Sequence, residues 1–233
     1  MVGGRRAASR SLLLLAGTTT LTQPAHAGAW AVAEGVQQWF AAVSHETGDF
    51  GESWRADDLI EAGLGGNWAV NAKIESEIRI SDFHDDRTAF QVGVLKAFAL
   101  TDRASFALQA SILGGEAVEG PECQDAGLEL RAALGTSFSL FGREGFVNAE
   151  AASRSRGDCD RQITEISAGL TFAPKWNLIL KAWDERGSGS LSTKAEASLS
   201  HDIGNFRIGL GWREEISGKF EEKGWVASLG AKF

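Results

Sequence analysis

Histidine and acidic side chains gather at one place in this chain where they could activate water. The stretch Ser81-Asp82-Phe83-His84-Asp85-Asp86 holds a His-Asp couple beside further carboxylates. His45 and Glu46 would lie close to it if both stretches reach the same end of the fold. A histidine oriented by a carboxylate can accept a proton from water, so a hydrolase with a site near His84 is one hypothesis. Solvated loop charge is the competing interpretation, and we favour it because polar loops commonly carry such residues.

Other motifs for catalysis or cofactor binding are weak. Ser200-His201 lacks an orienting acid, because the adjacent Asp202 would point to the opposite face of a strand. No Gly-rich phosphate loop, zinc-binding helix or nucleophile elbow is present. Clustered carboxylates could bind calcium or bridge lipopolysaccharide phosphates through divalent ions, although their spacing matches no calcium loop; they are Asp57, Asp58, Asp82, Asp85 and Asp86. We therefore expect no cofactor, no resident metal and no enzyme activity.

A larger set of polar and ionisable residues recurs at every second position, with apolar residues between. Successive side chains of a β-strand point to opposite faces, so this alternation predicts strands with one wet and one apolar face. The wet face would hold Glu61, Lys73, Glu75, Glu77, Arg79, Gln109, Glu129, Arg131, Asn148, Glu150, Arg154, Glu165, Lys181, Lys194, Glu196, Arg207 and Arg213. The apolar face would include Ile60, Leu64, Ile74, Ile78, Val92, Val94, Leu108, Leu128, Leu130, Ile166, Leu170, Leu178, Leu180 and Leu210.

The same alternation, broken by Gly, Asn, Asp and Pro, divides the chain into about twelve strands. The expected ranges are 36–45, 56–66, 69–80, 88–100, 104–114, 126–139, 146–154, 163–173, 177–186, 191–202, 206–216 and 223–233. Ten strands would remain if the first two segments or the weaker stretch 146–154 do not pair. Each range is close to the length of about 9 to 11 residues that a tilted strand needs to cross a bilayer.

Two kinds of connection alternate between these strands. Tight turns are expected at Asn67-Trp68, Thr101-Asp102-Arg103, Gly142-Arg143-Glu144-Gly145, Ala173-Pro174-Lys175 and Gly204-Asn205. Longer charged connections are expected at 46–55, 81–87, 115–125, 155–162, 187–190 and 217–222. Trp and Phe residues lie near the predicted strand ends, and Lys96, on an apolar face, could reach lipid headgroups from there. This layout is typical of a barrel with short turns at one rim and longer loops at the other.

Both ends of the chain predict export to an outer membrane. Arg5, Arg6 and Arg10 precede an apolar run, and Ala25-His26-Ala27 predicts a signal peptide over residues 1–27 that is cut before Gly28 on the ordinary secretory route. The last strand alternates through Trp225, Leu229 and the terminal Phe233, and it resembles the C-terminal assembly signal of Gram-negative outer-membrane proteins. Gly28-Ala29-Trp30 is similar to the start of an uncharacterised group of porin-like and transporter-like proteobacterial proteins.

The resemblance implies an all-β, transmembrane, antiparallel up-and-down barrel over residues 36–233, preceded by a lead-in at 28–35 that lies at the mouth of the lumen. The apolar face would then contact outer-membrane lipids and lipopolysaccharide, and the assembly machinery of that membrane would be a partner. Arg or Lys facing mid-bilayer lipid costs roughly 2 to 4 kcal/mol, so the charged face must line the lumen or lie at a rim.

Two cysteines, Cys123 and Cys159, are present, and an exported location permits their oxidation. The layout places them in the third and fourth outer loops, on the same side of the membrane. We expect a disulfide that stabilises the fold by about 3 kcal/mol on a loop-entropy estimate. A metal site is the alternative, but neither cysteine has a Cys or His neighbour at ligand spacing.

The charge of the chain excludes some partners and leaves three functional hypotheses. Of 23 basic residues three lie in the predicted signal peptide, which holds none of the 31 acidic residues, so the net charge falls from −8 to −11 on cleavage. Nucleic acid is therefore not expected as a partner. We favour a narrow channel that passes small hydrophilic solutes and selects them by field and size. The alternatives are a structural or surface-interaction barrel closed by ion pairs, and the outer-membrane hydrolase.

Overall fold

A computed structural model describes residues 28–49, 51–80, 86–116, 123, 126–187, 190–219 and 221–233. They form β1 (Gln37–Gly48), β2 (Gly51–Gly65), β3 (Trp68–Ile80), β4 (Arg87–Ala99), β5 (Ala104–Gly115), β6 (Gly127–Leu140), β7 (Arg143–Arg156), β8 (Cys159–Ala173), β9 (Trp176–Gly187), β10 (Ser190–Ile203), β11 (Phe206–Ser217) and β12 (Lys223–Lys232). The predicted signal peptide, and with it the expected cut before Gly28, falls outside the described residues.

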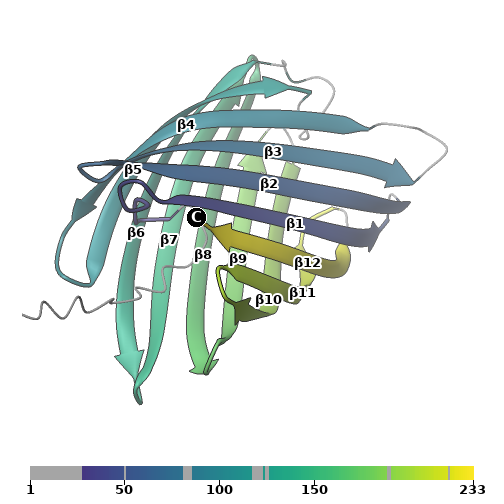
Figure 1. The fold of residues 1–233 in the computed structure, drawn as a ribbon. Helices are drawn as coiled ribbons and strands as arrows, with labels where there is room; N and C mark the ends of the chain where they lie inside the picture. Colours follow the sequence, from purple (N-terminus) through teal and green to yellow (C-terminus); the bar gives the residue numbers. More distant parts are fainter. Residues whose placement is uncertain are drawn as a thin grey trace, which may run out of the picture.

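Every strand pairs antiparallel with its neighbours in sequence, and β1 pairs with β12, so the sheet closes (Figure 1). At the seam the Phe233 N–H donates to the Gln37 carbonyl at 2.9 Å, and the Gln37 N–H donates to the Phe233 carbonyl at 3.1 Å. Closure leaves no unpaired strand edge, which is the condition for a sheet to cross a bilayer. The prediction of an up-and-down barrel of about twelve strands is confirmed.

The turns at the rim that holds the two ends of the barrel are short, as expected. They occupy residues 66–67, 100–103, 141–142, 174–175 and 204–205. Asn67, Phe141 and Lys175 adopt positive φ angles of 62°, 51° and 67°, which two-residue hairpins require and which side chains other than glycine seldom adopt. Three of the predicted turns take in strand residues, because Trp68 already begins β3, Arg143 already begins β7 and Ala173 still belongs to β8.

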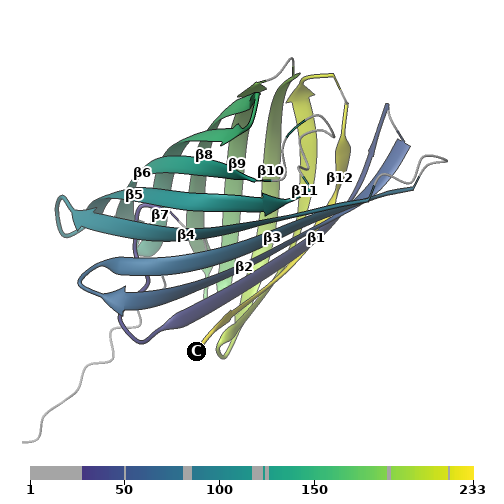
Figure 2. The ribbon, with the colours of Figure 1, turned by 90° about the horizontal axis from the view of Figure 1, so that it is seen from above.

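At the opposite rim half of the predicted long connections are wrong. Strands β1 and β2 are separated only by residues 49–50, β7 and β8 by 157–158, and β9 and β10 by 188–189. The polar residues that suggested loops belong to the strands, which continue with the same alternation beyond the apolar part of the wall. The other three connections are longer, at 81–86, 116–126 and 218–222. Figure 2 shows that the strands are tilted across the barrel.

The outer surface of the wall is apolar along most strands. Of the residues expected there, Ile60, Ile74, Val92, Leu130, Ile166 and Leu210 are exposed, and Leu170 is partly covered. The interior is largely polar. Its apolar residues include a buried cluster near the rim that holds the two ends of the barrel, which consists of Ala29, Leu95, Ala97, Ala107 and Ala133. The wall therefore separates an apolar exterior from a wet interior, as the alternation predicted.

No helix among the described residues is long and apolar enough to cross a membrane.

Candidate functional site: the charged interior

An interior cavity of about 390 Å³ lies between the strands and is lined mainly by ionisable side chains. Most residues expected on the wet face line it: Lys73, Glu75, Glu77, Arg79, Gln109, Arg131, Glu150, Arg154, Glu165, Lys181, Lys194, Glu196, Arg207 and Arg213. The other expected residues, Glu61, Glu129 and Asn148, are buried within the interior and do not line this cavity. Alternation along the strands brings the fourteen lining side chains to this cavity from eight strands.

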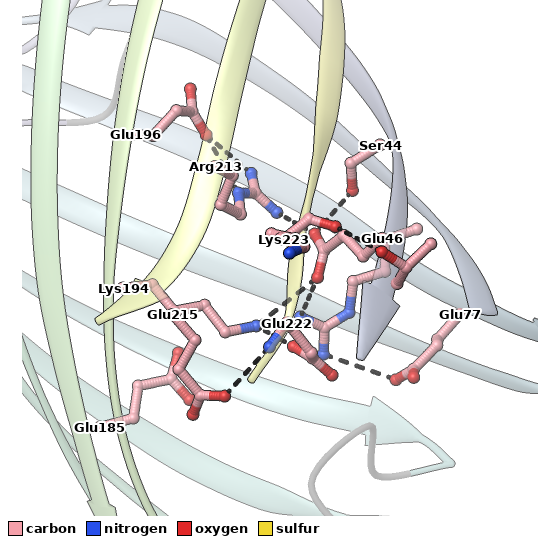
Figure 3. Close-up of polar contacts among 12 residues, drawn as sticks. Ser44, Glu46, Glu77, Glu185, Lys194, Glu196, Arg213, Glu215, Glu222 and Lys223 are labelled. Carbon is pink, nitrogen blue, oxygen red and sulfur yellow. Dashed lines mark hydrogen bonds and ion pairs between the residues drawn. The ribbon is translucent and has the colours of Figure 1, made fainter. Parts of the chain in front are cut away.

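The centre of one charge cluster is Glu46, whose side chain is only 1 % exposed (Figure 3). Its carboxylate accepts hydrogen bonds from Ser44 Oγ at 2.8 Å and from Arg213 Nη1 at 2.8 Å. Lys194 Nζ lies 3.6 Å from the same carboxylate, and Arg55 Nη1 lies 3.8 Å from it. One buried acid on β1 thus meets cations from β2, β10 and β11, which places it across the β1–β12 seam.

The cations around Glu46 have further acidic partners. Arg213 also pairs with Glu196 at 2.9 Å, and its guanidinium lies 5.2 Å from the centre of the Trp183 ring. Arg55 pairs with Glu77 at 3.5 Å, and Lys194 pairs with Glu222. Because Glu222 comes from the connection between β11 and β12, that connection contributes a carboxylate to the cavity.

A second charge cluster centres on Glu129 in β6. Its carboxylate accepts hydrogen bonds from Arg131 at 3.1 Å, from Arg154 at 2.9 Å and from Gln91 at 3.2 Å. Arg131 also donates to Glu150 at 2.6 Å. These bonds satisfy a fully buried acid, which would otherwise be costly to remove from water.

One ion pair spans the interior. Arg154 Nη1 on β7 lies 3.8 Å from Glu75 Oε2 on β3, although three strands lie between β3 and β7 in the wall. Glu75 in turn pairs with Lys73, which also lies 3.3 Å from Asp57. In a ring of twelve strands two strands four positions apart lie far across the ring, so this contact crosses the lumen rather than following the wall.

The charges that line the cavity are nearly balanced. Ten are basic: Arg55, Lys73, Arg79, Arg131, Arg154, Arg161, Lys181, Lys194, Arg207 and Arg213. Eight are acidic: Asp57, Glu75, Glu77, Glu150, Glu165, Glu185, Glu196 and Glu222. The cavity is therefore strongly polar and slightly cationic in a chain whose formal net charge is −8.

Sequence reasoning missed several interior residues, because it assigned them to loops. Glu46 and Arg55 fell in the expected connection 46–55, and Arg161 fell in 155–162. A signal for Glu46 was available, since the inward positions Ala42 and Ser44 continue to it without a break in the period of two. Where a strand end is polar on both faces, the contrast that reveals the period of two is lost.

The clustered aspartates do not form one site. Asp57 lines the cavity, whereas Asp58 pairs across the sheet with Ala41 and Ile74 on the opposite face. Asp82 and Asp85 lie outside the described residues. Within the described parts of the chain no group of three His, Cys, Asp or Glu residues could hold a metal ion.

The histidines of the described residues lie beside tryptophans on the outside of the wall. The His45 ring is 4.7 Å from that of Trp54, and His45 Nε2 lies 3.4 Å from Glu52. The His201 ring is 4.5 Å from that of Trp176 at the opposite rim. His84, on which the hydrolase hypothesis depends, lies outside the described residues.

The predicted disulfide between Cys123 and Cys159 is confirmed, with Cα atoms 5.4 Å apart. It joins the connection 116–126 to the first residue of β8. Both cysteines lie at the rim opposite the chain ends, as the strand parity predicted.

Comparison with known proteins relates the fold to outer-membrane barrels. Neither a protein family nor a curated protein matches this chain. Among solved structures, the COG4313 outer membrane channel from Pseudomonas putida F1 matches 88 % of this chain and 98 % of its own, with 8 % identity and a TM-score of 0.63. The NanC porin matches 84 % and 100 %, with 8 % identity and a TM-score of 0.60. The KdgM porin matches 83 % and 99 %, with 10 % identity and a TM-score of 0.57.

This chain therefore has the porin-like β-barrel fold of outer-membrane proteins. At such low identity the likeness concerns the fold alone, and function must be argued from the interior.

Proposed function

We propose that this protein is an outer-membrane channel that passes small hydrophilic solutes through a narrow, charged lumen. The observation that carries the proposal is the cavity of about 390 Å³ lined by ten basic and eight acidic side chains. A wall that served only to hold its strands together would gain nothing from open space among so many ions. Closely spaced charges of both signs suit a solute with several hydrogen-bonding groups and disfavour apolar ones.

The outer surface supports the placement in a membrane. Large apolar side chains on the exterior are exposed on every strand, whereas soluble proteins seldom expose contiguous apolar surface of that extent. Outer-membrane lipids and lipopolysaccharide would cover this surface. Trp225 and Leu229 of the last strand and Phe233 directly after it are exposed, and the assembly machinery would recognise them there after export by the predicted signal peptide.

Single-channel recording in planar bilayers tests the channel. We expect small, discrete current steps from protein whose heat-modifiable gel mobility shows that it is folded. Substitution of the cavity residue Lys181, which has no ion-pair partner among the described residues, by Glu should shift the reversal potential toward cation preference, because it reverses one charge in the lumen. Folded protein that produces no current steps would reject the channel.

A closed barrel is the second candidate, and the Arg154–Glu75 contact across the lumen favours it. If this pair blocks the lumen, the native protein is silent and Arg154→Gln conducts. Arg79→Gln is the matched control, because Arg79 pairs with Glu77 on its own strand. A silent native protein with a conducting Arg154→Gln variant would replace the channel by the closed barrel.

The hydrolase hypothesis rests on sequence alone. His84→Ala and Asp85→Asn address it, with peptides and lipid A as substrates. Hydrolysis that depends on both residues would support it, and hydrolysis unaffected by both changes would exclude this cluster.

A further inference from the structure

The segment that precedes the first strand runs inside the barrel, at the rim that holds both chain ends. Figure 1 shows it in purple where it leads into β1. Ala29 is completely buried, in one apolar cluster with Leu95 and Ala97 of β4, Ala107 of β5 and Ala133 of β6. These four wall residues point inward and are apolar, unlike the charged lining further along the same strands. The segment therefore covers one apolar part of a mostly polar inner wall.

Glycines make room on the wall for this segment. A Cβ atom at Gly135 would lie 2.3 Å from the Trp30 ring, and one at Gly63 would lie 2.1 Å from the Ala33 carbonyl oxygen. Non-bonded heavy atoms do not approach one another this closely, so any residue larger than glycine at Gly135 or Gly63 would displace the segment. The Trp30 ring also meets Phe146 edge to face, with ring centres 6.4 Å apart. The inner wall at Gly63, Gly135 and Phe146 is thus complementary in shape to this segment.

Hydrogen bonds hold the backbone of the segment at both of its ends. The Ala29 N–H donates to Asn148 Oδ1 at 3.2 Å, and Asn148 is itself fixed by donating to Glu150 at 2.7 Å. The Gly35 N–H donates to the Gly63 carbonyl at 3.2 Å, and the Gly63 N–H donates to the Val36 carbonyl at 3.0 Å. Between these ties the buried carboxylate of Glu61 bonds to the backbone of Val32. The segment is consequently anchored to β2 and β7 as well as packed on β4 to β6.

The opposite wall stays open. The cavity extends to Ser200 of β10, Arg207 of β11 and Ser228 of β12, whereas Leu95, Ala97, Ala107 and Ala133 do not line it. The segment therefore fills one side of the barrel mouth and leaves a passage along β10 to β12.

We propose that Gly28–Val36 is a resident plug that sets the width of the channel at its periplasmic mouth. The proposal rests on the proposed channel function. Solutes pass between the plug and β10 to β12, where Arg207, paired with Asp202 at 2.6 Å, faces them last. Displacing the plug widens the mouth and uncovers the apolar wall beneath it.

Two substitutions displace the plug from different sides, and conductance measures the result. Trp30→Ala removes its largest side chain, and Gly135→Leu fills the space of the same ring from the wall. We expect both to raise single-channel conductance at least about twofold, since conductance follows the open cross-section. Gly114→Leu is the matched control, because a Cβ there would meet the Phe90 ring at 2.1 Å on the outer surface. It should leave conductance unchanged.

A cross-link separates failure of the plug from failure of the channel. Cysteines placed at Ala29 and Ala107 should be joined by a short thiol-reactive cross-linker in the full-length folded protein, with the linked peptides identified by mass spectrometry. Native conductance unaltered in both displacement variants would overturn the plug and leave the channel intact. A silent protein in which the cross-link forms would reject the channel but keep the seated segment. Absence of the cross-link in folded protein would overturn the plug whatever the conductance.

Discussion

Replacing Glu46 by Gln should weaken the barrel much more than removal of an exposed carboxylate. The Glu46 side chain is 1 % exposed and meets Arg213 at 2.8 Å, Lys194 at 3.6 Å and Arg55 at 3.8 Å. Breaking a buried ion pair by neutralising one partner costs about 3 to 5 kcal/mol, because the remaining charge stays buried without compensation. The three cations keep Glu196, Glu222 and Glu77 as partners, so we expect a loss near the lower end, about 3 kcal/mol.

The free energy of unfolding can be measured by urea titration in detergent micelles, with heat-modifiable mobility and tryptophan fluorescence as two independent probes. Glu52→Gln is the control. Its pairing partner is His45 at 3.4 Å, and its side chain is 55 % exposed, so its loss should cost at most about 1 kcal/mol. A Glu46→Gln variant as stable as the Glu52→Gln variant would refute the idea that Glu46 holds the β1–β12 seam from inside.

Three further predictions concern other contacts. Replacing Cys123 and Cys159 together by Ser removes a link across 36 residues and should lower the free energy of unfolding by about 3 to 4 kcal/mol, and the unfolding of reduced native protein should match it. Deleting Phe233 removes both hydrogen bonds to Gln37 at the seam, so the yield of heat-modifiable barrel in the outer membrane should fall sharply while Phe172→Ala has little effect. If the native protein conducts, Arg154→Gln should raise conductance, because it breaks the contact across the lumen, and an unchanged value would show that Arg154 does not restrict the passage.

The barrel was predictable because its main determinant is local. A period of two specifies which face of a strand is wet, and the glycine, asparagine and proline turns specify where the chain reverses. The wet face predicted through Lys73, Glu75, Glu77 and Arg79 is one continuous row on β3. Strand length was harder to predict, since the outer ends of β1 and β2 are mostly polar and Trp54 alone marks the period there. Their pairing is decided by the partner strand, as between Glu46 and Ser53, and not by local composition.

Contacts across the lumen follow from a different cause and could not be read from the pattern. The pairing of Glu75 with Arg154 depends on the tilt and cross-section of the whole ring, which no single strand encodes. The plug was partly predictable, because apolar residues occupy some of the inward positions where the alternation calls for polar ones. Leu95, Ala97, Ala107 and Ala133 stand on the wet face yet are apolar, and apolar residues that point into water have no reason to gather unless something covers them. In barrels of this kind, a patch of apolar side chains on the inward positions of neighbouring strands therefore predicts an inserted segment, and the chain just before the first strand is the part that can reach it.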